Sequence, residues 1–522
     1  MGGGSFGARQ TGHVADFGGV GKWLQMPQVI AHPRAFNARP VRFFSTFRVR
    51  NRRYTDVAMQ IALKDFRAFQ ETALLEIRPL TFLIGENSSG KTSLLAALNY
   101  VWRFQERIAS TSLNSPPFDL GTFDEIVHRV RGRTKPDCFQ ILIREHITID
   151  PRRSPLYMSR GSIERSSATV ELRLTFVNNL GDADIAKLEL EYDGYILVVI
   201  VKDGFNIKVT DKLGRPVFDT LRGQGKFEFS GRIGRIDKVE FSEINFVLRR
   251  AVREASIGNE PNNNKGEPTE AEHALAVVSL ALDQLTRTFP NSIFASAPVR
   301  SNPSRVYTPS DQSRTPDGTH TPQRLFKIKE SDVSRWERIK DRIEKFGRMS
   351  GMFSAINVSR YRSSGSSPFH ITVTRKGKQS NIVDVGYGVS QALPILTDLI
   401  EAPPRSGFLF QQPEVHLHPQ AQAALGSFLV DYISNNRQCR IVAETHSDYL
   451  IDRVRIAIRE GDLRPADVSL LYFETNGTAT DVHEIEIDEY GNLENAPTGY
   501  REFFVREQMN LLGIDDTFGT VD

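Results

Sequence analysis

The hydrophobic pattern at the two ends of the chain predicts one α/β unit. Residues 59–69 (MQIALKDFRAF) alternate between apolar and polar as a strand does, and residues 74–84 (LLEIRPLTFLI) indicate two more short strands. Residues 406–419 (SGFLFQQPEVHLHP) and 439–447 (CRIVAETHS) each predict an apolar strand that ends in polar residues, with helical periodicity between them. The two ends of the chain are therefore expected to fold together.

The middle of the chain has a different pattern, which predicts an insertion into this unit. Segments within residues 168–202 either alternate between apolar and polar residues or are continuously apolar, which indicates antiparallel strands. Residues 271–289 and 331–349 have helical periodicity. Residues 258–270 are polar and of low complexity, and residues 303–323 are rich in Pro, Ser and Thr, which favours a long loop. No heptad pattern persists long enough to indicate a coiled-coil arm.

Composition is typical of a soluble globular protein and excludes several classes. Of the 522 residues, 39 % are apolar and 25 % charged, and no run approaches the roughly 18 apolar residues that cross a bilayer. We therefore expect no membrane association and a cytoplasmic location. The two cysteines, Cys138 and Cys439, form no CxxC pattern, which indicates a reducing compartment and argues against a disulfide framework or a zinc site.

Charge is distributed unevenly along the chain. Residues 1–58 contain nine Lys and Arg against two Asp, so the remaining 57 basic and 61 acidic residues give a net charge of −4. Charge therefore gives no support for nucleic-acid binding by the body of the protein. Three interpretations of the basic leader stay open: a segment upstream of a true start at Met59, a flexible basic arm, or a transit peptide. We expect much of it to be poorly ordered.

A glycine-rich loop, GENSSGKT, occupies residues 85–92 between a predicted strand and a helical run. Its backbone N–H groups can surround the β- and γ-phosphates of a nucleotide, Lys91 adds a positive charge, and the Thr92 hydroxyl is a ligand for Mg²⁺. The following helix directs its positive end at the phosphates. The alternative is an ordinary Gly/Ser loop, but the flanking strand and helix favour ATP and Mg²⁺. The predicted binding residues are Gly85, Glu86, Asn87, Ser88, Ser89, Gly90, Lys91, Thr92 and Ser93.

Two further motifs lie near predicted strand and helix ends. DVGYGVSQ (384–391) places two glycines and a serine before a helix, which is a second anion site or a simple helix cap by Ser390. Since one subunit needs only one phosphate loop, the second site would contact a nucleotide held by a partner subunit. Glu414 follows the predicted strand end at 411, and His446 follows the one at 445. Glu414 can activate the attacking water, and His446 can sense the γ-phosphate. His416 and His418 form a His-x-His pair, for which loop contacts are the favoured interpretation over metal binding.

The order of these motifs resembles the ABC-type ATPases of the RecF/SMC/OLD branch. More narrowly, it resembles the AAA-15/AAA-21-type ATPases of bacterial two-gene anti-phage and abortive-infection cassettes, also in APVRSNPSRVY (297–307) and PFDLGTFDEIVHR (117–129). The resemblance covers roughly residues 59–504. It implies an α/β fold, an ABC-type P-loop ATPase head with a large mixed α+β insertion. The implied division is leader 1–58, head 59–104, insertion 105–381 and head 382–522.

The resemblance also implies roles. ATP is held between two heads, with the phosphate loop of one facing the signature of the other, formed by Gly386, Gly388, Ser390 and Gln391. His446 is the switch histidine. A short match at Lys64 and Arg67 places these two residues near the nucleotide base.

One departure from the resemblance concerns the strand end before Glu414. Relatives have an acid at the first position and Glu or Gln at the second, whereas this chain has Gln411 and Gln412. An amide is not a general base and binds a metal less strongly than a carboxylate does. We therefore expect slow ATP hydrolysis, with Glu414, Gln412 and His446 as catalytic residues and Thr92 and Gln411 as metal ligands.

Three functions remain open at this point. The first is a sensor ATPase that dimerises around ATP and controls a separately encoded effector, expected to be a nuclease, in anti-phage defence. The second is a DNA-repair head of RecF type, for which nucleic acid is a partner, and the third is a transporter subunit. The large insertion argues against the third. About seventy-five residues follow His446, which leaves no room for the Toprim nuclease of OLD proteins.

Overall fold

The structure is a computed structural model of the 522-residue chain. It describes residues 58–105, 113–129, 134–149, 165–201, 205–219, 270–362, 367–497, 499–500 and 509. All of them belong to one compact unit. The predicted basic leader therefore lies, except for its last residue, outside the described residues. No helix in the described ranges is long and apolar enough to cross a bilayer.

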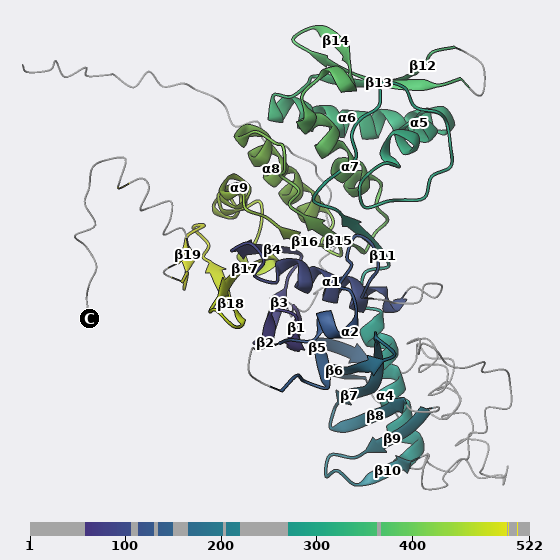
Figure 1. Cartoon of the computed structure of the whole chain (residues 1–522), viewed down its shortest axis with the longest axis vertical. Coiled ribbons are helices and arrows are strands. Elements are labelled where there is room, and N and C mark those ends of the chain that lie inside the picture. Colours follow the sequence, from purple (N-terminus) through teal and green to yellow (C-terminus); the bar gives the residue numbers. More distant parts are fainter. Residues whose placement is uncertain are drawn as a thin grey trace, which may run out of the picture. The chain divides into compact units, whose positions relative to one another are not determined.

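Seven strands of the described residues form the sheet that carries the phosphate loop, in the order β11-β15-β16-β4-β17-β18-β19 (Figure 1). The first five are parallel, and β18 and β19 continue antiparallel from β17. The strands are β4 (Leu80–Gly85), β11 (Ser292–Ser296), β15 (Ser406–Gln411), β16 (Arg440–Glu444), β17 (Val468–Thr475), β18 (Thr480–Ile487) and β19 (Leu493–Glu494). Because carboxyl ends of parallel strands meet at one edge, the residues that follow β4, β15 and β16 come together there.

A second sheet is antiparallel, with nine strands in the described part of the chain. Its order is β10-β9-β8-β7-β6-β5-β1-β2, with β3 paired to β1. Along β5, buried and partly exposed residues alternate, so one face is covered, and the helix α4 (Glu270–Thr286) packs there. The strands are β1 (Met59–Phe66), β2 (Phe69–Glu71), β3 (Leu75–Ile77), β5 (Cys138–Ile149), β6 (Ser166–Asn179), β7 (Asp182–Tyr192), β8 (Tyr195–Val201), β9 (Phe205–Thr210) and β10 (Pro216–Asp219).

A third sheet is small and antiparallel, with the strand order β12-β13-β14. Helices α6, α7, α8 and α9 contact one another in a chain of neighbours, α7 to α6, α6 to α8 and α8 to α9. The elements are α1 (Lys91–Trp102), α2 (Phe123–Ile126), α5 (Thr321–Ser331), α6 (Val333–Ser350), β12 (Ala355–Arg360), β13 (Phe369–Arg375), β14 (Lys378–Asn381), α7 (Tyr387–Glu401), α8 (Pro419–Asn435) and α9 (Asp448–Arg459), with 3₁₀ turns at Arg103–Gln105, Ile382–Asp384 and Pro465–Asp467.

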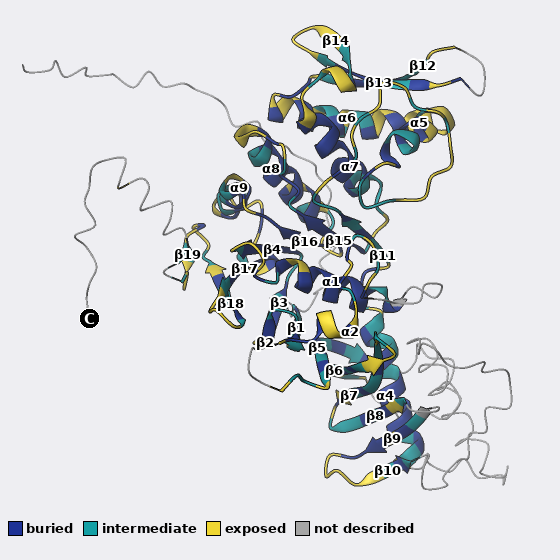
Figure 2. Ribbon diagram, in the orientation of Figure 1, coloured by how far each residue is buried: buried dark blue, intermediate teal, exposed yellow. Residues whose placement is uncertain are grey.

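The parallel sheet separates two hydrophobic cores, and every residue of β15 is buried (Figure 2). On one face, Leu409 joins a core that contains α1, α4 and the antiparallel sheet. On the other face, Phe408 and Phe410 join a core formed with α5 to α9. This alternation follows from the two-residue period of a strand. Burial on both faces explains why the sequence of these strands is continuously apolar.

The α/β class is confirmed, but two strands have partners that the sequence did not indicate. The first strand, β1, belongs to the antiparallel sheet, where it pairs with β5 from the predicted insertion 105–381. The strand β11 lies within the same predicted insertion, yet it is an edge strand of the parallel sheet, paired with β15. The helix predicted at 331–349 is α6, which begins after Asp332 caps its first turn by accepting a hydrogen bond from the Arg335 amide.

Candidate functional site

The loop after β4 has a backbone that requires glycine at both ends. Gly85 has φ of 126°, and a Cβ there would lie 2.1 Å from the carbonyl oxygen of Phe473 on β17. Gly90 has φ of 93°, and a Cβ would lie 2.6 Å from the ring of Phe69. L-residues rarely adopt such angles, and neither position has space for a side chain. The two predicted glycines therefore fix the shape of the loop.

The helix that follows this loop leaves its first amides free of side-chain caps. Gly90 is the N-cap of α1, no side chain bonds to the cap, and no acidic residue occupies the first turn. The free N–H groups and the helix dipole together favour an anion at this end. Eleven of the twelve residues of α1 are buried, so the helix is held firmly behind the loop.

Lys91 is buried within the loop. Its Nζ donates hydrogen bonds to the carbonyl oxygen of Gly85 at 3.1 Å, to Ser89 Oγ at 3.4 Å, and to the carbonyl oxygen of Glu86. Burial lowers the pKa of Lys91, while the negative charges of Glu444 and Glu86 oppose that shift. This cation within the loop adds a positive charge beside the uncapped start of α1, which is suited to phosphate oxygens.

Glu444, at the end of β16, is a site residue that the sequence analysis missed. Thr92 Oγ1 donates a hydrogen bond of 2.8 Å to Glu444 Oε2, and the Glu444 side chain is buried. The signal that could have found it is an acid at the end of an otherwise apolar strand, because carboxylates are seldom buried without a partner. The structure therefore adds a carboxylate to the predicted Mg²⁺ ligand Thr92.

Gln411 and Gln412 lie at the end of the neighbouring strand, β15. Gln411 pairs in register with Glu444, and its buried Nε2 has no hydrogen-bond partner among the described residues. The Gln412 amide donates to the carbonyl oxygen of Glu444 at 2.9 Å. Gln412 has φ of 44°, a left-handed backbone that costs about 1–3 kcal/mol for such a residue. The strand end is thus held in one conformation next to the phosphate loop.

Glu414 is buried and bonds to the end of the next strand. Its Oε1 accepts a hydrogen bond from the His446 amide at 2.8 Å, and its Oε2 is buried without a partner in the described residues. Burial raises the pKa of Glu414, although that hydrogen bond, a bond from Thr445 and the charge of Arg300 counteract it. Arg300 is itself buried, which lowers its pKa to about 10. Glu414 therefore fixes the loop that carries His446.

His446 has an exposed side chain close to Lys91. Partial burial of the ring lowers its pKa, and the Lys91 charge lowers it further, so the imidazole is mainly neutral near pH 7. The neighbouring Ser447 is engaged within the head: its Oγ donates to Gln422 at 2.6 Å and caps α9 by accepting from the Leu450 amide. Ser447 is thus engaged within the head, whereas the predicted residue His446 stays exposed near Lys91.

The predicted signature forms the first turn of α7. Gly386 is the N-cap, without a side-chain cap or an acid in the first turn, so the alternative that Ser390 caps this helix is wrong. The Ser390 hydroxyl donates to the carbonyl oxygen of Tyr387 at 2.8 Å. A Cβ on Gly388 would lie 3.1 Å from the carbonyl oxygen of His416, so this turn packs against the loop after β15.

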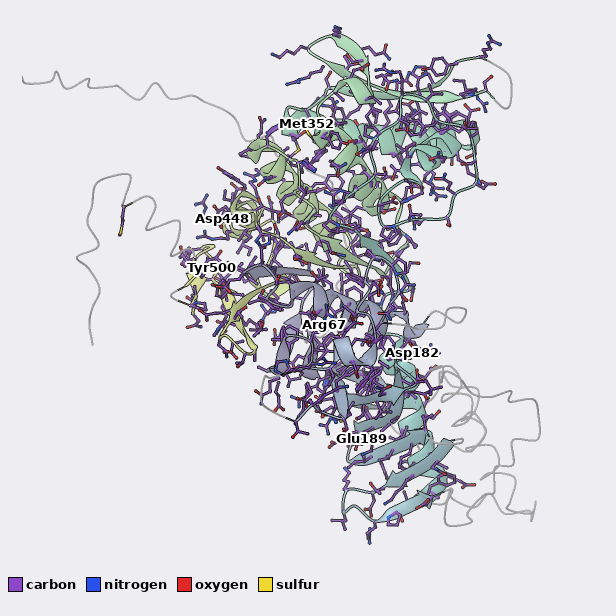
Figure 3. All side chains as sticks on the ribbon, in the orientation of Figure 1. Arg67, Asp182, Glu189, Met352, Asp448 and Tyr500 are labelled. Carbon is purple, nitrogen blue, oxygen red and sulfur yellow. The ribbon has the colours of Figure 1, made fainter. Side chains whose placement is uncertain are left out.

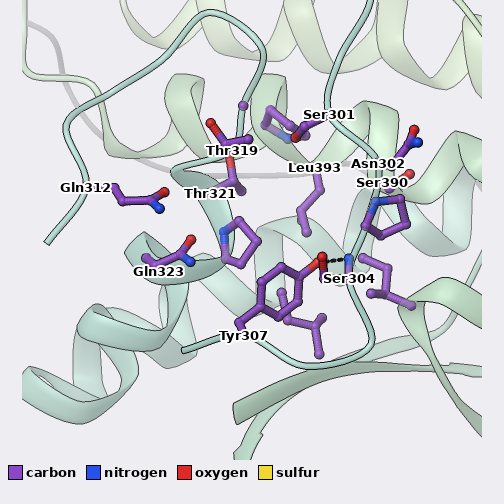
Figure 4. A pocket seen from close by; sticks show the side chains of 16 residues that line it. Ser301, Asn302, Ser304, Tyr307, Gln312, Thr319, Thr321, Gln323, Ser390 and Leu393 are labelled. Carbon is purple, nitrogen blue, oxygen red and sulfur yellow. Dashed lines mark hydrogen bonds between the residues drawn. The ribbon is translucent and has the colours of Figure 1, made fainter. Parts of the chain in front are cut away.

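A pocket beside α7 differs in chemistry from the phosphate loop. It has a volume of about 180 Å³ and includes Ser390, Asn302 and Tyr307 among its lining residues (Figure 4). All sixteen lining residues are uncharged, and none belongs to the loop 85–93. It therefore offers no positive charge to a triphosphate.

The two residues predicted near the base lie on and just after β1. Arg67 donates from Nη1 to the carbonyl oxygens of Leu120 and Glu125, which ties its guanidinium to the segment around α2 (Figure 3). Lys64 is exposed and lies 3.7 Å from Glu71. Their proximity to a base stays a prediction.

Family models match three parts of the chain. AAA_15, an AAA ATPase domain, matches residues 59–141, and AAA_21, described as an AAA domain, putative AbiEii toxin of a type IV TA system, matches residues 201–452. Both models describe AAA domains, and their matches include the loop 85–93 and the strand ends at Gln411 and Glu444. A third model, DUF3696, of unknown function, matches residues 463–502 of this ATPase. No curated protein sequence matches the ATPase significantly.

Solved structures that resemble this ATPase include SMC heads. One is an Smc head bound to the C-winged helix domain of ScpA, 10 % identical, covering 83 % of this chain and 98 % of its own, with a TM-score of 0.40. The Smc head with an extended coiled coil from Pyrococcus furiosus is 8 % identical, covers 87 % and 99 %, and has a TM-score of 0.36. The SMC head from Thermotoga maritima is 11 % identical, covers 83 % and 99 %, and has a TM-score of 0.35. All three TM-scores are low, so the likeness is loose.

Proposed function

We propose that this ATPase binds ATP with Mg²⁺ at the loop 85–93, dimerises head to head around it, and hydrolyses it slowly. The observation that carries the proposal is the convergence of three features at one sheet edge. They are the uncapped start of α1, the cation of Lys91 inside the loop, and the bonded pair of Thr92 and Glu444. Together they fit a phosphate chain and a divalent cation.

Dimerisation is proposed because the chain has a second helix start of the same kind. Like α1, α7 begins at a glycine with no side-chain cap and no acid in its first turn. One nucleotide needs one such helix start for its β- and γ-phosphates. The start of α7 would therefore contact the γ-phosphate bound by a second copy, through Ser390 and the Gly388 amide.

The cellular role is proposed from the family description. AAA_21 is described with a putative AbiEii toxin of a type IV toxin–antitoxin system, which supports a two-gene defence cassette. We propose that the ATPase acts in the cytoplasm, and that ATP-driven closure of the heads holds or releases a separately encoded effector, a nuclease, in anti-phage defence. A gene for such an effector next to this one would support this role.

The nucleotide assignment is tested with Lys91→Ala and a fluorescent ATP analogue in the presence of Mg²⁺. Each charged hydrogen bond that is lost costs about 1.5–3 kcal/mol, so we expect the dissociation constant to rise at least about tenfold. Lys378→Ala, an exposed lysine on β14, is the matched control and should bind as the parent does. Undiminished affinity in a folded Lys91→Ala protein would refute the assignment.

A further inference from the structure

We propose that Glu444 is the acidic Mg²⁺ ligand of this ATPase, on β16, in place of the usual strand-end acid on β15, where the chain has Gln411. The inference rests on the proposed function and deepens it. It assigns the metal to a residue that the sequence analysis did not consider, and it reassigns the ligand role that was predicted for Gln411.

The distance between the two candidate ligands fits one small cation. Thr92 Oγ1 and Glu444 Oε2 are 2.8 Å apart. Mg²⁺ binds oxygen at about 2.0–2.1 Å in an octahedron, which separates neighbouring ligands by about 2.9 Å. A hydroxyl and a carboxylate can therefore occupy adjacent corners of one octahedron with little movement.

The strand order brings Glu444 closer to the phosphate loop than Gln411. β16 pairs directly with β4, which leads into the loop, and places Glu444 opposite Leu83. β15 lies one strand further away, beyond β16. Neighbouring strands are separated by about 4.8 Å, so a ligand on β15 lies about that much further from the phosphate loop than a ligand on β16.

Both side chains belong to the same layer and the same face of the sheet. Gln411 and Glu444 are paired in register. Two residues earlier on each strand, Leu409 and Val442 lie in the core on the α1 side, and side chains two residues apart share a face. Position 444 therefore offers a carboxylate to the region in which Thr92 lies.

The charges explain why glutamine occupies position 411. Glu444 is buried, and its charge acts on the buried Lys91. A second carboxylate at position 411 would lie in register beside it, and two adjacent buried carboxylates repel each other. A glutamine at position 411 keeps a polar side chain there without adding a second negative charge.

We expect the protein to supply only part of the coordination shell of the cation. No group of three or more His, Cys, Asp or Glu side chains gathers as a metal site within the described ranges. The remaining ligands would then be phosphate oxygens and water, as is usual for Mg²⁺ beside a nucleotide. One carboxylate and one hydroxyl are a sufficient contribution from the protein for such a site.

The test measures how much Mg²⁺ tightens nucleotide binding to the full chain. The Mg²⁺ gain is the ratio of the dissociation constants for a fluorescent ATP analogue in EDTA and in Mg²⁺. Glu444→Gln preserves the shape of the side chain and an oxygen that can accept from Thr92, so we expect it to fold and to bind nucleotide in EDTA. Its Mg²⁺ gain should fall at least about tenfold, and Mn²⁺ binding with ADP, followed by EPR, should weaken in parallel.

Two control variants separate a ligand from a general effect of charge. Glu460→Gln removes an exposed carboxylate outside the loop, and Gln411→Ala removes the amide predicted as a ligand. Both should keep the Mg²⁺ gain. The proposal is overturned if Glu444→Gln keeps its full gain or if Glu460→Gln loses as much. It is also overturned if Gln411→Ala loses the Mg²⁺ gain. This measurement tests the proposal even if the Glu444→Gln protein does not fold.

The same measurements distinguish this proposal from the proposed function. If the parent protein binds no nucleotide in EDTA or in Mg²⁺, the proposed function fails. If nucleotide binds with an undiminished Mg²⁺ gain in Glu444→Gln, only the assignment of the metal ligand fails.

Discussion

At the scale of single residues, the site depends on a few polar atoms fixed by their neighbours. Glu414 holds the His446 amide with one oxygen, while its other oxygen is buried without a partner in the described residues. The free oxygen can accept a proton, whereas Gln411 and Gln412 cannot serve as bases. This arrangement supports Glu414 as the residue on which slow turnover depends, and its bonded oxygen also gives it a positioning role.

We expect Glu414→Gln to bind ATP as the parent does and to release phosphate at least about tenfold more slowly, since general bases contribute about 10²–10⁴-fold. Because burial raises the pKa of Glu414, the parent rate should fall as pH drops through a value above the ordinary range of glutamate. Steady-state phosphate release from pH 5 to 8 checks both points, and the pH dependence should disappear in the variant. Glu460→Gln, an exposed acid, is the control; an unchanged rate in Glu414→Gln would place the base elsewhere.

The sequence predicted the loop 85–93 with its glycines and Lys91, but it did not predict that Glu444 lies beside Thr92. Glycines and Lys91 are recognisable because the loop is continuous in sequence and its conformation requires them. Glu444 is separated from Thr92 by about 350 positions, and its relevance depends on which strand lies beside β4. Periodicity cannot supply that order, so the sequence alone indicated Gln411 as the metal ligand.

At the scale of elements, one buried ion pair joins the two large sheets. Arg440, the first residue of β16, places Nη2 3.2 Å from Oε1 of Glu145 on β5. Burial raises the pKa of Glu145, and bonds from Arg440 and Thr288 oppose the shift. The pair thus connects the strand that ends at Glu444 to the antiparallel sheet.

Arg440→Ala should lower the free energy of unfolding by about 3–5 kcal/mol near pH 7, because it leaves Glu145 buried without its partner. When folding raises the pKa of a carboxyl, that group stabilises the native state at pH values below its unfolded pKa. This stabilisation is lost as the pH rises. The destabilisation should therefore grow with pH from about 4 upward. Urea unfolding at several pH values measures it, with Arg437→Ala, an exposed arginine, as a control within about 0.5 kcal/mol of the parent. An Arg440→Ala protein as stable as this control would contradict the prediction.

The periodicity of the sequence located most elements of the head, including α1, α8, β15 and β16. It did not reveal which strands pair, because β4 lies between two strands that are encoded more than 350 residues later. It also did not reveal that β11 joins the parallel sheet, since a short apolar strand has the same pattern in either sheet.

At the scale of the whole molecule, the proposed function requires two copies. Ser390→Arg should bind ATP with unchanged affinity but should not associate when ATP is added, because the larger charged side chain obstructs the start of α7. Sedimentation velocity with and without ATP measures this. Ser310→Arg, on an exposed loop, should associate as the parent does, while normal ATP-driven association of Ser390→Arg would exclude this surface from the contact.

The position of β4 between β16 and β17 also has a consequence for how the protein is made. β4 is buried at five of its six residues, yet its neighbours begin about 355 residues later in the chain. At about 5–20 residues per second, a ribosome needs roughly 20–70 s to supply the first of them. Throughout that time an apolar strand and an incomplete phosphate loop have left the exit tunnel without their permanent neighbours. A nascent chain that bound ATP during this interval would lack Glu444, so the site is completed only late in translation, when the strand that carries this residue has emerged.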